Sequence, residues 1–181
     1  QYVRGEFAYM HTWKFGKRER IAIATRALAG VGFAYGNSNA LPFEQLFWVG
    51  GSNSMRGWQT RSLGPGKSPL DTSLSIPNQT GDMRIEANLE FRFPMFWLLN
   101  GALFFDAGNV WQKREITDFR NFAEGIAFNT GLGLRLDIQF VVIRFDWGIK
   151  LKDPSQQEWA KFEEWFKRGG SAFQFGIGYP F

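Results

Sequence analysis

Residues 83–93 read Met-Arg-Ile-Glu-Ala-Asn-Leu-Glu-Phe-Arg-Phe, and apolar and polar side chains alternate through the whole stretch. In a β-strand its apolar residues, from Ile85 to Phe93, would all point to one side, and its charged residues and Asn88 to the other. An α-helix would mix the two sets, because its period is 3.6 residues. The stretch is therefore predicted to be a strand with one apolar face and one polar face.

The same alternation recurs along the chain, and we expect seven strands in total. In the segment 139–151, for example, Phe145 and Trp147 oppose Arg144 and Asp146. Strands of about ten residues or more are typical of tilted membrane strands, whereas strands in soluble sheets are usually about five or six residues long. The predicted strands are residues 2–14, 19–36, 83–94, 100–111, 125–137, 139–151 and 171–181.

The two faces of these strands favour a membrane barrel over a soluble β-sandwich or a lipocalin-like barrel, both of which would alternate in the same way. The polar face carries opposed charges and glycines, while the apolar face carries many of the 20 Phe, 8 Trp and 4 Tyr. A lipid-facing surface with aromatic girdles and a polar interior are typical of outer-membrane barrels. The fold class is therefore predicted to be all-β: one antiparallel transmembrane β-barrel unit over residues 1–181.

The expected connections alternate between short and long, as in outer-membrane barrels, where short periplasmic turns alternate with longer outer loops. The short connections are 14–18, 94–100 and 137–139, and the long ones are 37–81, 112–124 and 152–170. Bacterial single-chain barrels have an even number of strands, so seven strands do not close one. Since an open edge in lipid leaves backbone groups unsatisfied, we expect the first strand to pair with a strand outside this sequence.

The composition argues against several other classes of protein. The chain has no cysteine and a single histidine, His11, which excludes thiol chemistry and a histidine-rich metal site. Its net charge of +4 at pH 7 comes from interspersed signs, so no basic block indicates nucleic-acid binding. The acidic residues lie among arginines that would keep them ionised, which does not suit a general acid. We therefore expect no enzyme activity, no metal site and no cofactor.

The segment 37–81 is too long for a turn. Loops of this length in a compact domain are usually functional or disordered, and this one is rich in aromatic residues and glycine, which disfavours disorder. If it folds into the barrel interior, Arg56 becomes a buried cation that needs a carboxylate partner. Asp106 is the candidate, because it falls on the polar phase of its strand, opposite Leu103 and Phe105. An arginine can donate two hydrogen bonds to one carboxylate.

Several motifs together resemble a known family. Met-Arg-Gly-Trp at 55–58 resembles the Val-Arg-Gly-Phe/Tyr tip of the lid loop in the BamA/TamA superfamily of outer-membrane assembly factors, with Met in place of the usual Val. Phe-Phe-Asp-Ala-Gly at 104–108 resembles the strand motif that receives the lid arginine. Gly-Leu-Gly-Leu-Arg at 131–135 and Ile-Arg-Phe-Asp at 143–146 resemble two later strand motifs. The alternating aromatics of 173–181 resemble the C-terminal β-signal.

The resemblance covers the whole chain and implies the last seven strands of a 16-stranded barrel in the bacterial outer membrane, with 37–81 as the lid loop. It implies a barrel that inserts or translocates other outer-membrane proteins through a lateral seam between its first and last strands. The implied partners are outer-membrane lipids, client outer-membrane proteins, the N-terminal strands and POTRA repeats of the same protein, and accessory subunits.

Two other functions stay open beside that one. A two-partner secretion translocator shares the lid loop, and a passive porin or transporter would share the barrel. Within the superfamily, the sequences at 49–58 and 61–66 look closer to the TamA-like proteins of Bacteroidota (TamL) than to proteobacterial BamA.

The resemblance also assigns roles to residues. The lid-loop motif is Met55, Arg56, Gly57 and Trp58. The residues implied to receive the lid on the inner wall are Asp106, Gly108, Glu86, Glu90, Arg135 and Asp146. The C-terminal β-signal comprises Phe173, Phe175, Ile177, Gly178 and Phe181. An alternative is that the charged residues only hold the barrel wall and the loop together.

Three further features of the sequence can each be interpreted in two ways. Glycines on the polar phase at positions 131, 133, 148, 176 and 178 would leave room for the lid loop, or would only allow the barrel to curve. In the last strand, Gly176, Gly178 and Pro180 would weaken the ladder of hydrogen bonds, or Pro180 would simply end the strand. The segment 159–168 would form a short helix or a solvated loop cap.

Overall fold

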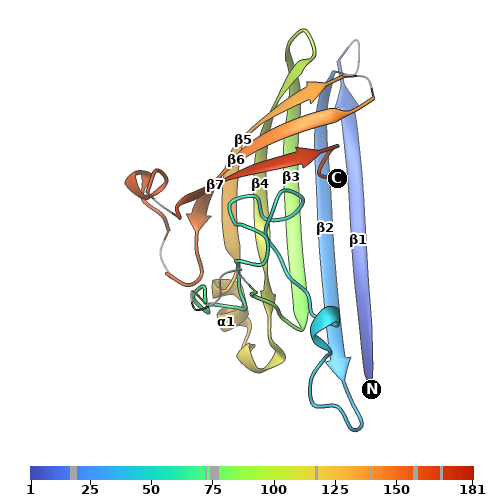
Figure 1. Ribbon diagram of the computed structural model, residues 1–181, viewed down its shortest axis with the longest axis vertical. Helices are drawn as coiled ribbons and strands as arrows, with labels where there is room; N and C mark the ends of the chain where they lie inside the picture. The colour runs from blue at the N-terminus through green and yellow to red at the C-terminus, as the bar shows by residue number, and fades with distance from the viewer. Residues whose placement is uncertain are drawn as a thin grey trace.

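A computed structural model describes residues 1–16, 20–71, 73, 78–116, 118–138, 140–156, 159–167 and 169–181. These residues form one antiparallel sheet in which each strand pairs with the next along the chain (Figure 1). The strands are β1 (Tyr2–Phe15), β2 (Ile21–Ala34), β3 (Met83–Phe96), β4 (Leu99–Trp111), β5 (Ala127–Asp137), β6 (Val142–Lys152) and β7 (Ser171–Ile177). The prediction of seven antiparallel strands is confirmed.

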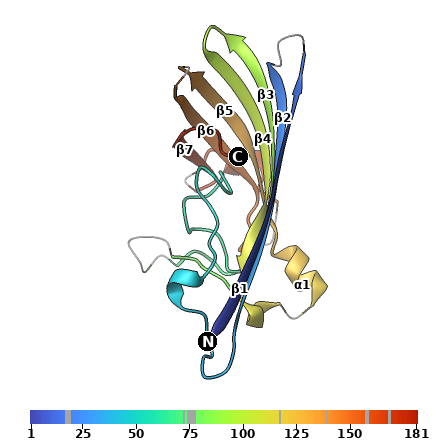
Figure 2. The ribbon, with the colours of Figure 1, turned by 90° about the vertical axis from the view of Figure 1, so that its right-hand side faces the viewer.

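The sheet is strongly curved, and the described residues of the segment 37–81 lie on its concave side (Figure 2). We keep the name lid loop for this segment. We call the side that faces the lid loop the inner face. Along β3 the inner residues Glu86 and Glu90 are buried, whereas the outer residues Ile85 and Leu89 are exposed. In β3 the period-two pattern of the sequence therefore separates a polar, covered face from an apolar, uncovered one.

The interior of the structure combines a small apolar core with a larger polar layer. The apolar core joins the lid loop to β4 and β5, and it consists of Phe47, Val49, Met55, Trp58, Leu63, Val110 and Ala127. The register of the sheet places Asn88 of β3 opposite Asp106 of β4, and Asp106 opposite Asn129 of β5. The polar inner residues of three strands thus lie side by side beneath the lid loop.

The last strand is shorter than predicted. β7 ends at Ile177, so the prediction that the strand continues to Phe181 is wrong. Gly178 has a φ of +84°, a left-handed conformation that glycine adopts at little cost, and the chain turns there. Pro180 is buried, and the Phe181 ring turns to the inner face, where its centroid lies 5.3 Å from the guanidinium carbon of Arg26.

The long connection after β4 contains a helix that was not predicted. The helix α1 (Phe119–Glu124) begins after Asp118, whose side chain accepts a hydrogen bond from the backbone N–H of Asn121 at 2.6 Å. Because α1 and the turn after it occupy the preceding residues, β5 starts at Ala127 and not at residue 125.

Other boundaries also differ. β6 starts at Val142 and not at 139, because the turn after β5 includes a hydrogen bond from the Ile138 N–H to the Val141 carbonyl. In the segment 159–168 the helix is one 3₁₀ turn, η3 (Phe162–Glu164), and two more 3₁₀ turns are η1 (Phe43–Gln45) and η2 (Lys113–Glu115). Parts of the expected turns and strand ends, at residues 17–19, 139 and 168, lie outside the described residues. No helix among the described residues is long and apolar enough to cross a membrane.

Candidate functional site

The tip of the lid loop is a compact turn held by its own backbone. The N–H of Gly51 donates to the carbonyl of Trp58 at 2.9 Å, and the N–H of Trp58 donates to the carbonyl of Met55 at 3.1 Å. The N–H of Gly50 donates to the Ser54 hydroxyl at 3.0 Å. This turn presents Arg56 to the sheet while Met55 and Trp58 enter the apolar core.

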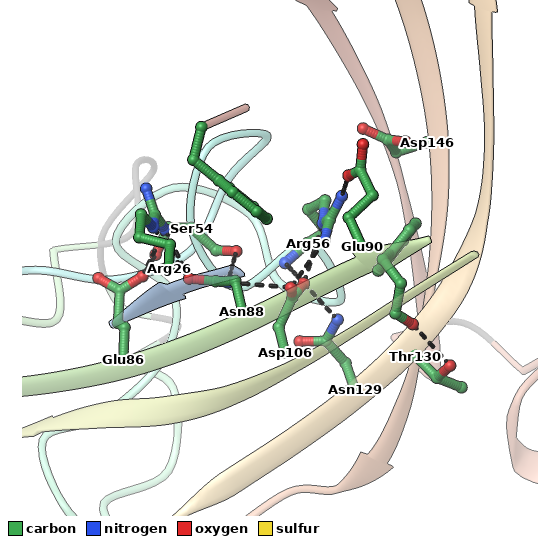
Figure 3. A network of polar contacts seen from close by, with 12 residues as sticks. Arg26, Ser54, Arg56, Glu86, Asn88, Glu90, Asp106, Asn129, Thr130 and Asp146 are labelled. Carbon is green, nitrogen blue, oxygen red and sulfur yellow. Dashed lines mark hydrogen bonds and ion pairs between the residues drawn. The ribbon is translucent and has the colours of Figure 1, made fainter. Parts of the chain in front are cut away.

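Arg56 is the centre of the contact between the lid loop and the sheet (Figure 3). Its side chain is 1% exposed, and its Nε and Nη2 donate to the two carboxylate oxygens of Asp106 at 3.0 and 2.8 Å. The Arg56 backbone N–H adds a third bond to Asp106 at 3.2 Å, and Nη1 donates to Glu90. The guanidinium also lies 3.6 Å from the centroid of the Phe104 ring. Such a bidentate, fully buried pair fixes the orientation of both partners.

The charge of Arg56 is maintained by its surroundings. Burial alone would lower the pKa of the guanidinium, but the carboxylates of Asp106 and Glu90 outweigh that effect and raise the pKa above its ordinary value. The arginine therefore remains a cation in the interior.

Asp106 has two further donors from the neighbouring strands. The side-chain amide of Asn88 donates to Asp106 Oδ1 and that of Asn129 donates to Oδ2, each at 2.9 Å. The Asn88 amide also donates to the carbonyl of Ser54 in the lid loop at 3.1 Å. The carboxylate is thus held by β3, β5 and the lid loop at once.

The charged network extends from Glu90 toward β5 and β6. Arg135 donates to Glu90 at 3.1 Å and to Asp146 at 2.6 Å, and both of its partners are buried. Arg92 donates to the other oxygen of Glu90 at 2.8 Å. Arg144 lies beside Asp146 and donates to Asn53 of the lid loop. Glu90 and Asp146 therefore each face at least two guanidinium groups, and these ion pairs hold neighbouring strands of the inner face together.

Some of the expected residues do not join the Arg56 contact. Glu86 pairs with Arg26 of β2 at 3.2 Å and accepts a hydrogen bond from the Ser54 hydroxyl at 2.7 Å. Gly108 packs against the backbone of β3 near Glu86 and not against the lid-loop tip. Gly57 packs against the side chain of Asn129.

At Gly148 of β6 the backbone of the lid-loop tip lies directly against the sheet. A Cβ atom on Gly148 would lie 2.5 Å from the carbonyl carbon of Arg56 and 2.7 Å from the backbone nitrogen of Gly57. At this glycine, the room that the sequence provides is used by the lid-loop backbone. At Gly131, Gly133 and Gly176 the nearest atoms include side chains of the inner face.

The lid loop also contacts the last strand. The side-chain amide of Gln174 in β7 donates to the carbonyl of Trp58 at 2.9 Å. Of the expected β-signal residues, Phe173, Phe175 and Ile177 are exposed on the outer face. Phe181 instead lies on the inner face, with its ring centroid 5.9 Å from the Arg56 guanidinium carbon. The edge strand and the lid-loop tip are therefore in direct contact.

Four residues of the site were not predicted from the sequence: Arg26, Asn88, Asn129 and Gln174. All four lie on the polar phase of predicted strands, which was the available signal. Asn88, Asn129 and Gln174 carry no charge, and the partners of all four residues depend on strand register, which one sequence leaves open.

Asn88→Ala is expected to lower the free energy of unfolding by about 1–3 kcal/mol, because it removes a donor from a buried carboxylate and leaves Arg26 with one partner fewer. Urea unfolding of the full-length protein in lipid vesicles measures the change. The matched control is Thr130→Val, which removes one hydroxyl bond to the Phe104 carbonyl and should cost less. Equal stability of Asn88→Ala and the unmodified protein would contradict the role assigned to Asn88.

Comparisons with known proteins found a matching family and a relative of this chain. The model of a family described as the Omp85 superfamily domain matches residues 1–181. The outer membrane protein assembly factor BamA of Neisseria meningitidis serogroup B is 28% identical over 119 residues. That match covers 63% of this chain and 15% of the BamA chain, so this chain spans only a small part of its relative's length.

Proposed function

The chain belongs to the Omp85 superfamily, and we propose that it forms part of a barrel that inserts or translocates other outer-membrane proteins through a lateral seam. The superfamily and the BamA relative place the chain in the bacterial outer membrane. The partners we propose are client outer-membrane proteins, accessory subunits, and N-terminal strands and POTRA repeats of the same protein. The closer likeness to TamA-like proteins stays a prediction.

One observation carries the proposal: the edge strand β7 is short and is tied to the lid-loop tip. β7 has seven residues, against 14 in β1 and 11 in β6. The hydrogen bond from Gln174 to Trp58 connects it to the loop that Arg56 anchors. β7 pairs with β6 over fewer residues than β6 pairs with β5. The unpaired N–H and C=O groups along the other side of β7 can pair with an incoming strand by β-augmentation.

The lid loop supports a role other than passive diffusion. It lies against the inner face and forms an apolar core with residues of β4 and β5. This part of the barrel interior is therefore occupied by protein. A porin needs an aqueous path there. We expect the full-length protein to show low conductance in planar bilayers, whereas a porin would show a steady open pore.

A photo-crosslinking experiment tests the seam. A photoreactive amino acid at Phe175 of β7 should crosslink to an unfolded client protein during insertion into vesicles that contain the full-length protein. The matched control is the same amino acid at Leu89 of β3, because both side chains are exposed on the outer face and Leu89 lies in a strand paired on both sides. If clients insert while both positions crosslink equally or not at all, the seam is not at β7.

A further inference from the structure

The loop between β6 and β7 carries a group of aromatic rings outside the site described above. We call Trp159, Phe162, Trp165 and Phe166 the aromatic loop cluster. Trp159 is 62% exposed, Phe162 66% and Phe166 64%. In Figure 1 this loop extends sideways from the ends of β6 and β7, away from the lid loop. Large apolar groups so exposed and so close together usually mark a contact surface.

The cluster is attached to the outer face of the sheet. Trp159 stacks on Phe128 of β5, with ring centroids 5.6 Å apart and planes 16° from parallel. The Ala160 N–H donates to the Leu151 carbonyl of β6 at 2.8 Å, which fixes the start of the segment. Phe166 lies 5.9 Å from Trp147 of β6. The loop is therefore not a cap over the barrel interior.

The outer face that the cluster joins is the lipid-facing one. Trp147 stacks on Phe173 of β7 at 6.0 Å, and Phe173 is 83% exposed on the outward phase. Since the protein lies in the outer membrane, the outer face of its strands meets lipid. The cluster prolongs this aromatic surface beyond the strand ends, on the side of the long loops, which in outer-membrane barrels is the extracellular side.

The segment is amphipathic over a single turn. Phe162 packs against Trp165 and Phe166, with ring centroids 5.1 and 5.5 Å apart. Between and beside these rings, Lys161, Glu163 and Lys167 are exposed. The turn is held by a hydrogen bond from the Lys161 N–H to the Glu164 carboxylate at 3.1 Å. Amphipathic segments that lie in the membrane interface likewise combine aromatic rings with charged side chains.

We propose that residues 159–167 anchor this loop in the outer leaflet of the membrane, with the aromatic loop cluster at the boundary between headgroups and acyl chains. Tryptophan and phenylalanine are common on the apolar face of interfacial segments, and the exposed Trp159 indole can place its N–H near water. Lys161 and Lys167 lie at the two ends of the turn, where they can meet lipid phosphates. The loop next to the edge strand β7 is thereby held at a fixed depth. The proposal depends on the membrane location alone and not on the insertion of clients.

Spin labelling tests this depth directly. This chain has no cysteine, so Phe162→Cys and Glu163→Cys each offer one labelling position in it. The full-length protein carrying a nitroxide at one position is reconstituted in vesicles of phosphatidylethanolamine and phosphatidylglycerol. Collision with oxygen, which concentrates in lipid, is compared with collision with a water-soluble nickel chelate.

The label at position 162 should collide more with oxygen and less with the nickel chelate than the label at position 163, although the two are neighbours in one turn. Equal nickel access at both positions would show a loop in water and overturn the proposal. Low access to both reagents at position 162 would show that protein covers the ring and would also overturn it. Heat-modifiable mobility on gels verifies folding, and Phe166→Cys serves as a second reporter with the same expected contrast.

Discussion

Arg56→Ala is expected to destabilise the folded barrel by about 3–5 kcal/mol, which is typical when one partner of a buried ion pair is removed. The side chain is almost fully buried and holds Asp106 through two bonds and Glu90 through a third. Its removal leaves two buried carboxylates without their shared cation, and it also empties the space over the Phe104 ring. The lid-loop tip would then lose its strongest attachment to the sheet.

The loss can be measured as a lower midpoint of urea unfolding of the full-length protein in lipid vesicles. Arg120→Ala is the matched control, because Arg120 pairs with Glu124 while its side chain is 88% exposed. An exposed pair of this kind contributes about 1 kcal/mol or less. If Arg56→Ala and Arg120→Ala had the same small effect, the Arg56 pair would not hold the lid loop.

Exchanging the charges, as Arg56→Asp with Asp106→Arg, should restore only part of the lost stability. The new aspartate at position 56 would face Glu90, which already accepts hydrogen bonds from Arg135 and Arg92. Full recovery would indicate that Glu90 contributes nothing to the Arg56 contact.

Gly148→Val is expected to have the second largest effect, since it drives the lid loop off the sheet. A side chain at position 148 would overlap the backbone of Arg56 and Gly57, and backbone atoms cannot turn away as a flexible side chain can. Overpacking typically costs about 1–3 kcal/mol, and a clash with backbone belongs at the upper end of that range or beyond it. The measurements are the urea midpoint and the rate at which an external protease cuts the lid loop.

The control for that variant is Gly5→Val in β1, where a Cβ atom would meet nothing within 4 Å. We expect the protease to cut the lid loop faster in Gly148→Val than in Gly5→Val. Equal protection in the two variants would contradict the close approach of the loop to β6.

Much of the sheet could be predicted, because the alternation of apolar and polar residues that indicates a strand can be seen within each short segment. In β3 every second residue from Glu86 to Glu90 is buried, and the same period appears in the sequence. The contact between Arg56 and Asp106 was predicted from two sources: a buried cation needs a carboxylate, and the motifs resemble those of a family. The seven strands followed from the same alternation in each segment.

The departures arose where tertiary structure overrides the local pattern. Phe181 continues the alternation of Phe173 and Phe175, yet the left-handed turn at Gly178 takes it to the inner face beside Arg56 and Arg26. The helix α1 has only six residues, too few for a helical period to stand out. The rings of residues 159–167 have mixed spacing, and their orientation depends on Phe128 and Trp147, which are distant in sequence.

The most direct test of the proposed function is the rate at which an unfolded outer-membrane protein becomes folded in vesicles that contain the full-length protein. Control vesicles contain an equal mass of an unrelated porin. We expect a rate about tenfold higher than in the control, which corresponds to a barrier lower by about 1.4 kcal/mol. The same rate in both sets of vesicles, with the protein correctly folded, would contradict the role in insertion.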